Sequence, residues 1–410
     1  MSSFDAPLPA LPPAEKIALN LGFMRLVDAA PLVVARELGF FARFGLEVDL
    51  VREVSWANIR DKVTVGALDA GQMLAPMPLL TSLGVGGLRC PLLTGLTLNL
   101  NGNAIALSTG LYAQLDCGAE PADDPLPVAR ALARHLAASG AYLTLATVYP
   151  FSTHTLQLRL WLAAGGIDPD AQVRLVVLPP EQMVDSLTQG LIDGFCVGEP
   201  WNSAAVQSGV GVIVASGYDV WNNAPEKVLG VTAAWHEAHP GAHLRLRLAL
   251  MEAGRWLADA EHRAQAAQLL ASRCYLDLPQ TLLLPALLGR HRYRRNGALH
   301  VNPDFLVFHR YQAGFPWHSA AEQLARECLG LLGRPLPAVE LGALAASCYR
   351  TDLYRDAART LAWPCPQADS RSGSEQDGPQ EVAPGIVVGA NRRLAPDAGY
   401  LAALRASCAP

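Results

Sequence analysis

Residues 17–23 read Ile-Ala-Leu-Asn-Leu-Gly-Phe, and residues 46–51 read Leu-Glu-Val-Asp-Leu-Val. Both runs alternate apolar and polar residues, which is typical of β-strands. Between them, residues 29–43 carry apolar side chains at helical spacing, and Gly45 provides a helix stop. A strand, a helix and a second strand in this order predict a βαβ unit with parallel strands and a right-handed crossover.

The same order of elements continues along the chain. A helix at 58–68 and an apolar segment at 71–83 follow, and a further strand is expected at 103–108. After a Pro-rich loop at 116–126, a second α/β unit is expected, with helices at 127–138, 153–164 and 181–190 and strands at 142–147, 173–178 and 193–198. Further helices are expected at 235–239, 243–272, 279–289 and 318–332.

We therefore predict an α/β fold with two lobes, each a mostly parallel sheet flanked by helices, and a helical C-terminal extension. The predicted first lobe comprises residues 16–112 and returns, with the extension, at 231–365; the second comprises 113–230. Residues 366–385 are rich in Ser, Gly and Pro, which predicts a flexible linker. The partly apolar tail at 386–410 is expected to dock on the body or on a partner.

The composition excludes several classes of protein. With 410 residues and 51% hydrophobic residues, the chain is long enough for two or three lobes. Its net charge of −5 argues against a general nucleic-acid binder, which would carry a basic surface. The eight cysteines include no Cys-x-x-Cys pair, so neither a zinc site nor a disulfide framework is predicted.

The start of the chain bears on location. Residues 1–13 contain several prolines and lack the basic and apolar regions of a signal peptide. No run of about 18 uncharged apolar residues occurs, so no membrane span is expected. We therefore expect a cytoplasmic protein, with the reservation that an upstream signal peptide would place it outside.

Catalytic signatures are absent from the sequence. It has no Gly-x-x-x-x-Gly-Lys-Ser/Thr phosphate loop, no Gly-x-Ser-x-Gly elbow and no His-Glu-x-x-His pair, and no Gly-x-Gly-x-x-Gly follows the first strand. These absences favour a binding protein over an enzyme, and we predict no cofactor and no metal.

Polar residues at the ends of predicted elements could instead form a binding site. Trp56, after the second strand, offers an indole N–H and no acceptor, which suits an anion; it could also be a core residue. Asn103 could donate its amide into a cleft or belong to a turn with Gly102. His154 opens a predicted helix, where free N–H groups attract anions, or it is an exposed first-turn residue.

Two further candidates follow later strands. Gly198 allows a close approach of the backbone to a ligand, or it belongs to a tight turn. Glu199 would repel an anion, so we expect it to orient other groups or to serve a proton or a metal. Lys227 is a compact cation that could bind an anion or lie solvated on the surface. Together these donor-bearing segments predict a small anion pocket at the carboxyl ends of strands.

The longest informative segments are Phe195-Cys-Val-Gly-Glu-Pro-Trp-Asn202 and Pro225-Glu-Lys-Val-Leu-Gly-Val231. Supporting segments are Leu21-Gly-Phe-Met, Asp28-Ala-Ala-Pro-Leu, Gly39-Phe-Phe-Ala-Arg-Phe-Gly45, Ser55-Trp56, Met73-Leu-Ala-Pro-Met-Pro78, Asn99-Leu-Asn-Gly102, and His154 followed by Arg159-Leu-Trp-Leu-Ala-Ala-Gly-Gly166. From about residue 17 to about residue 360, the chain resembles the NrtA/CmpA family of nitrate- and bicarbonate-binding proteins of ABC transporters.

The resemblance implies a periplasmic-binding-protein-like fold of type II that binds nitrate or nitrite in its cleft. It implies anion ligands at Trp56, His154, Gly198 and Lys227. At Asn103 the chain departs from the family, because the nitrate binders have glutamine there. The shorter amide retains the donor but changes its position, which bears on ligand size and on nitrate-versus-nitrite preference.

No signal peptide is predicted. Within this family we therefore expect the chain to resemble the cytoplasmic nitrate/nitrite sensors of the NasS type. That resemblance implies a protein partner, a NasT-type RNA-binding antiterminator, held when the anion is absent and released when it binds. Two alternatives remain open. One is the substrate-binding component of a nitrate, nitrite or bicarbonate ABC transporter; the other is an enzyme on the same fold, such as the pyrimidine synthases of thiamine biosynthesis.

Overall fold

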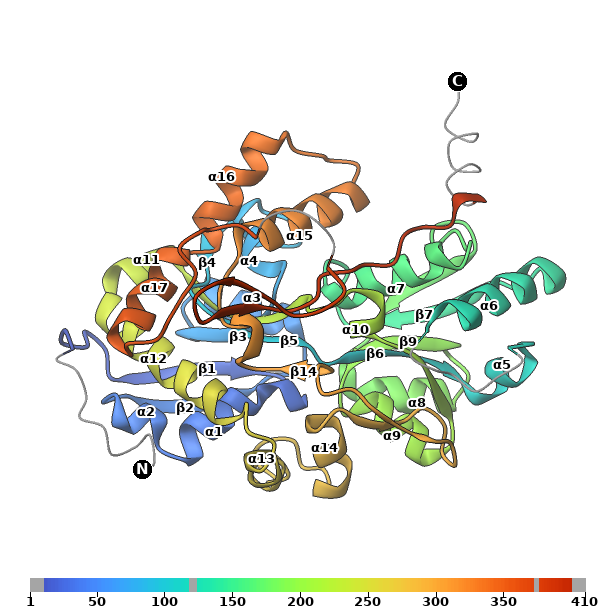
Figure 1. Cartoon of the computed structure of the whole chain (residues 1–410), viewed down its shortest axis with the longest axis horizontal. Helices are drawn as coiled ribbons and strands as arrows, with labels where there is room; N and C mark the ends of the chain where they lie inside the picture. Colours follow the sequence, from blue (N-terminus) through green and yellow to red (C-terminus); the bar gives the residue numbers. More distant parts are fainter. Residues whose placement is uncertain (1–10, 118–123, 372–375, 400–410) are drawn as a thin grey trace.

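The computed structural model describes residues 11–117, 124–371 and 376–399, and it shows two β-sheets side by side with helices around them (Figure 1). Across the first sheet, the strands are β14 (Leu306–Val307), β5 (Thr97–Asn101), β11 (Pro225–Thr232), β3 (Ala70–Leu74), β1 (Ala18–Phe23) and β2 (Glu47–Arg52), with β4 (Leu92–Leu93) also paired to β11. The second sheet has β10 (Gly211–Ser216), β6 (Asn103–Ser108), β9 (Gly194–Gly198), β7 (Leu143–Thr147) and β8 (Val173–Val177). This is the predicted two-lobed α/β architecture.

The opening βαβ unit forms as predicted, with β1 parallel to both β2 and β3. The predicted single helix at 29–43 is divided into η2 (Val27–Ala29), α1 (Ala30–Glu37) and α2 (Phe40–Arg43). The break lies at Gly39, whose φ of 77° is a left-handed conformation that ends a helix. The first lobe also contains α3 (Trp56–Thr64) and α4 (Met77–Ser82).

The second lobe surrounds its sheet with α5 (Thr109–Gln114), α6 (Leu126–Ser139), α7 (Thr153–Ala164), η3 (Pro180–Gln182), α8 (Met183–Thr188), α9 (Trp201–Ser208) and α10 (Gly217–Val220). Its apolar core includes Leu145, Leu158 and Cys196. Another apolar cluster is shared between the lobes, with Leu26 and Met73 from the first and Phe195 and Val197 from the second. The lobes therefore meet through packed side chains.

The chain crosses between the lobes earlier than the boundaries we predicted at 112/113 and 230/231. Strand β6 pairs with β9 and β10 of the second sheet, and β11 pairs with β3 and β5 of the first. Each crossing strand runs antiparallel to its neighbours, so the sheets are more mixed than the predicted mostly parallel ones. The predicted boundaries and strand directions differ from the structure because these strands pair with segments far away in the chain. Local periodicity does not show which distant segments pair.

The helical extension is present, with α11 (Ala233–Ala238), α12 (Pro240–Trp256), α13 (His262–Leu270), α14 (Gln280–Leu287), η4 (Arg310–Gln312), α15 (His318–Leu331), α16 (Ala338–Cys348) and α17 (Thr351–Thr360). Strands β12 (Arg290–Arg292) and β13 (Leu299–Val301) form a hairpin within it. The helix expected at 243–272 is two helices, α12 and α13. Among the described residues, no helix combines the length and apolar character needed to cross a membrane.

The segment at 366–385, predicted to be a flexible linker, makes specific contacts in its described residues. Arg355 donates to the carbonyl groups of Pro366 and Gln367, and the Asp369 carboxylate accepts from Thr351. Strand β15 (Gln380–Ala383) pairs with β16 (Ile386–Val388). Polar composition suggested a free segment, whereas specific hydrogen bonds to α17 hold it against the body.

The tail that follows docks on the second lobe. The Leu394 N–H donates to the Val220 carbonyl at 2.9 Å, and the Arg393 guanidinium lies 4.2 Å from the centroid of the Trp221 ring. The predicted tail extends to residue 410, and its part at 400–410 lies outside the described residues. In Figure 1 the dark red segment runs from the helical extension across to α7 and α10.

Candidate functional site

The five predicted site residues come together at the seam between the lobes. The first lobe contributes Trp56, the first residue of α3, and Lys227 in β11. The second contributes Asn103 at the start of β6, His154 in the first turn of α7 and Gly198 at the end of β9. Asn103 and Gly198 are direct register partners. Whether they contact a ligand stays a prediction.

Lys227 is the charged centre of this site. Its side chain is fully buried, and its Nζ lies 2.9 Å from Asp28 Oδ2 and 2.8 Å from Glu226 Oε1. Burial alone would lower its pKa, but the two carboxylates outweigh burial and raise the pKa. Lys227 is therefore a permanent cation, and the alternative of a solvated surface lysine is wrong.

Asp28 and Glu226 are site residues that the sequence analysis did not assign. The Gln72 amide donates to Asp28 Oδ1 at 2.7 Å and so fixes this carboxylate against Lys227. Both acids stood inside the quoted segments, at Asp28-Ala-Ala-Pro-Leu and Pro225-Glu-Lys. An acidic residue within an otherwise apolar run, as at position 28, is the signal that could have identified it, because buried charges require a partner.

His154 is buried, so the alternative of an exposed first-turn histidine is wrong. Ser152 caps α7 by accepting from the Thr155 N–H at 3.2 Å, and this places His154 at the helix N-terminus facing the seam. Burial, followed by the nearby charge of Lys227, holds the pKa of His154 well below its usual range. The neutral ring has Nδ1 3.1 Å from Glu226 Oε1.

Trp56 is buried beside Lys227, whose Nζ lies 5.2 Å from the centroid of the Trp56 ring. Its indole N–H has no hydrogen-bond partner among the described residues, and the same holds for both ring nitrogens of His154. Buried polar atoms are normally satisfied, so unpartnered ones mark a place where a ligand or water belongs. Trp56 is therefore buried as a core residue would be, and its N–H is still available to donate to a ligand.

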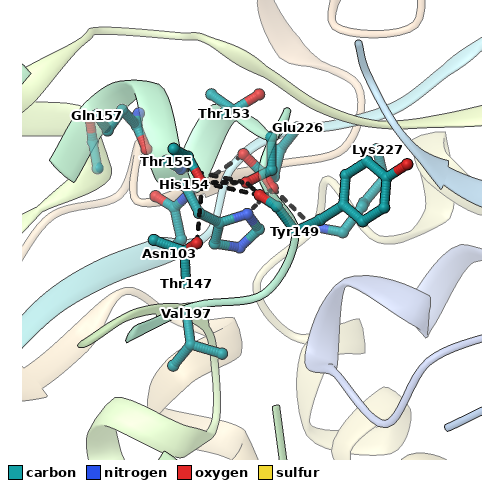
Figure 2. Close-up of polar contacts among 12 residues, drawn as sticks. Asn103, Thr147, Tyr149, Thr153, His154, Thr155, Gln157, Val197, Glu226 and Lys227 are labelled. Atoms are coloured by element: carbon teal, nitrogen blue, oxygen red, sulfur yellow. Dashed lines mark hydrogen bonds and ion pairs between the residues drawn. The ribbon is translucent and has the colours of Figure 1, made fainter. Parts of the chain in front are cut away.

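Asn103 follows a turn and begins a strand, and its role as a ligand donor stays a prediction. Asn101 and Gly102, with φ of 58° and 99°, form the turn, and Asn103 then begins β6. Its Nδ2 donates to Glu226 Oε2 at 3.1 Å, as drawn in Figure 2. Figure 2 also shows the Glu226 carboxylate lying between His154 and Lys227.

Gly198 lies where the two lobes meet, and a side chain at this position would make ordinary van der Waals contacts with the first lobe. A Cβ at this position would lie 3.4 Å from both terminal carbons of Leu26 and 3.7 Å from Asp28 Oδ2. The next residue, Glu199, accepts from the Val27 N–H through its carbonyl at 2.9 Å. Its carboxylate accepts from the Ser203 N–H at 3.2 Å, so it orients the start of α9.

Polar contacts across the seam hold the lobes closed over the site. Arg25 of the first lobe forms an ion pair with Glu181 of the second. Arg60 Nη1 donates to the Tyr149 hydroxyl at 2.7 Å. The Thr153 hydroxyl donates to the Pro225 carbonyl at 3.0 Å. These contacts exclude water from the site, which strengthens the electrostatic interactions inside it.

Comparison with known proteins places this geometry in a family. Residues 12–271 match the NMT1-like family. The chain is 40% identical over 375 residues to the nitrate import ATP-binding protein NrtC of Synechocystis, covering 89% of this chain and 53% of that protein. It therefore spans about half the length of NrtC. It is 32% identical over 373 residues to the bicarbonate-binding protein CmpA of Synechococcus, covering 88% of this chain and 81% of CmpA.

Among solved structures, the periplasmic nitrate-binding protein NrtA of Synechocystis superposes with a TM-score of 0.80 at 29% identity, covering 92% of this chain and 97% of NrtA. This likeness confirms the predicted periplasmic-binding-protein-like fold. The names of these relatives describe binding and transport, in agreement with the predicted non-enzymatic role. The chain belongs to the NMT1-like family and, within it, to the nitrate- and bicarbonate-binding proteins that include NrtA and CmpA.

Proposed function

We propose that this chain binds nitrate or nitrite at the seam between its lobes and acts as a cytoplasmic sensor of that anion. The observation that carries the binding proposal is the fully buried Lys227 beside the unpartnered Trp56 indole N–H, with His154 and Asn103 opposite. A fixed cation and neutral donors in a water-excluded site suit a small oxyanion.

The position of the site gives binding a way to act on the whole molecule. Its donors come from both lobes, so an anion contacting all of them stabilises the closed arrangement. A partner that binds only the open arrangement is then released when the anion binds, because both ligands act on one equilibrium. The coupling typical of such systems is about 1–3 kcal/mol, which corresponds to about 5–150-fold in affinity.

The partner we propose is an RNA-binding antiterminator of the NasT type, held by the anion-free sensor and released to act on nitrate-assimilation genes. The resemblance of the chain to NasS-type sensors supports this partner.

The test is size-exclusion chromatography of the chain mixed with the antiterminator, with and without sodium nitrate or nitrite. We expect a complex without the anion and separate peaks with it. Chloride at the same ionic strength is the control for salt. A complex that persists at saturating nitrate and nitrite, or that never forms, contradicts the sensor proposal.

A second candidate function is a binding domain of a nitrate, nitrite or bicarbonate ABC transporter. The coverage of only half of NrtC favours it, because a domain like this one forms part of an import ATP-binding protein. This candidate predicts a complex with the transporter's ATP-binding or membrane component and none with the antiterminator, so the same chromatography with both partners separates the two functions.

A further inference from the structure

Glu226 occupies the predicted anion site although anion binding gives it no role. Its Oε1 lies 2.8 Å from Lys227 Nζ and 3.1 Å from His154 Nδ1. Its Oε2 accepts from Asn103 Nδ2 at 3.1 Å. Two of the five predicted anion ligands, Lys227 and Asn103, therefore donate to this carboxylate, and His154 lies beside it without a hydrogen bond.

A carboxylate resembles the proposed ligand in shape and charge. It is planar, carries one negative charge over two oxygens, and accepts hydrogen bonds without donating them. Nitrite and nitrate share these properties. Lys227 and Asn103, two of the donors that would recognise a free oxyanion, are thus engaged by Glu226.

We infer that Glu226 is an internal competitor for the oxyanion, so that an external anion binds only when this carboxylate is neutralised by a proton. The inference rests on the proposed anion-binding function and adds its regulation. According to this inference, Glu226 determines how tightly the site binds an external anion.

The charges around Glu226 support this competition. Lys227 is the nearest cation, and it is already paired with Asp28 of η2, which Gln72 holds in place. Of the groups packed against Glu226 from the second lobe, His154 and Thr153 of α7 are neutral, as are Asn103 of β6 and Cys196 of β9. With Asp28 and Glu226 both ionised, the site has two negative charges and one positive charge, which disfavours a further anion.

This competition predicts that the protein takes up a proton when the anion binds. Burial raises the pKa of Glu226, although Lys227 opposes the shift, so its neutral form is accessible. An anion that binds the neutral form brings one proton into the site, and its affinity then falls about tenfold per pH unit above that pKa. His154 is another titratable group beside Glu226, and burial and the charge of Lys227 hold its pKa well below its usual range.

The experiment is isothermal titration calorimetry of the intact chain with sodium nitrate and sodium nitrite at pH 6, 7 and 8. Two buffers of different ionisation enthalpy report the protons taken up on binding. The variants are Glu226→Gln, which keeps the shape and removes the charge, and Glu252→Gln. Glu252 is a matched control because burial also raises its pKa, but it pairs with Arg43 away from the seam.

For the wild-type chain and Glu252→Gln we expect affinity that weakens with rising pH and uptake of about one proton. For Glu226→Gln we expect affinity at least tenfold tighter at pH 8, little pH dependence and no uptake. Binding by the wild-type chain without proton uptake, or equal affinities in wild type and Glu226→Gln, overturns the inference alone.

Two other outcomes are also decisive. Binding by Glu226→Gln alone supports the inference, because removal of the competitor then creates the site. Binding by neither protein overturns the proposed function and the inference with it. If Glu226→Gln does not fold by circular dichroism, the proton uptake of the wild-type chain decides.

Discussion

The Trp56 indole N–H is a buried donor without a partner in the described part of the chain. If it donates to the anion, Trp56→Phe removes one hydrogen bond to a charged group while it keeps most of the buried aromatic surface. Such a bond contributes about 1.5–3 kcal/mol, so we expect anion affinity to fall by about ten- to a hundredfold.

Calorimetric titration with nitrate and nitrite measures this effect, and Trp161→Phe is the matched control. Trp161 is equally buried, but its N–H donates to the Pro125 carbonyl at 3.0 Å in the core of the second lobe. Its substitution is expected to lower stability without changing anion affinity. Equal affinity losses in the two variants would show that Trp56 acts through packing alone.

Glu199 makes stability depend on pH. Burial raises its pKa to about 7, more than the opposing hydrogen bonds from Ser203 lower it. The folded state therefore holds a proton that the unfolded state loses near pH 4.5, so folding stability decreases as pH rises from about 4.5 to about 7. The loss is on the order of 3 kcal/mol for this shift.

Glu199→Gln should remove this loss, because the amide does not ionise and can still accept from the Ser203 N–H. We expect the variant to match the wild type near pH 5 and to be more stable near pH 8, in urea unfolding at each pH. The same difference between the two proteins at both pH values would refute a raised pKa at Glu199.

Local sequence identified the donors of the site but not its acids. Trp56, His154 and Lys227 stand out because each is a hydrogen-bond donor near an end of a predicted element. Asp28 and Glu226 do not, since their roles depend on Lys227 being buried between them. Burial of a lysine is a property of the assembled lobes, and a sequence pattern does not report it.

At the scale of elements, the loop after β1 and the start of η3 form a contact between the lobes. Arg25 pairs with Glu181 there, and its carbonyl accepts from the Trp201 indole at 3.1 Å. The ion pair joins the two lobes, so we expect it to break if they separate. Because a partly exposed pair contributes about 0.2–1 kcal/mol, Arg25→Met should weaken anion binding by at most about fivefold.

Arg159→Met is the control for this prediction, because Arg159 pairs with Asp170 at 2.5 Å within the second lobe. Calorimetry with nitrate should give wild-type affinity for this control. Unchanged affinity in Arg25→Met would show that the contact between the lobes does not contribute to closure.

Elements that depend on local pattern were predicted well, and those that depend on distant pairing were not. Strand β1 and helix α7 have the predicted positions because their periodicity and caps are local. The lobe assignments of β6 and β11 follow from antiparallel pairing between segments far apart in the chain. The left-handed Gly39 likewise divided a helix whose apolar spacing appeared continuous.

At the scale of the whole molecule, the C-terminal segment links the helical extension to the second lobe. Arg371 donates to the Gly389 carbonyl at 2.6 Å, and Asn223, between α10 and β11, donates to the Ala390 carbonyl at 2.8 Å. The segment therefore contacts the residues between α10 and β11, where the chain passes from the second lobe to the first (Figure 1). The composition alone suggested a linker. Composition describes how polar a segment is, but it does not show which backbone groups of the folded protein the segment can hydrogen-bond.

The central claim is that the seam between the lobes binds nitrate or nitrite. The most direct measurement is calorimetric titration of the purified chain with nitrate, nitrite, bicarbonate and chloride at one ionic strength. The account predicts micromolar, saturable binding of nitrate or nitrite with one site per chain and no binding of chloride. No binding of any oxyanion, or binding of bicarbonate alone, would contradict it.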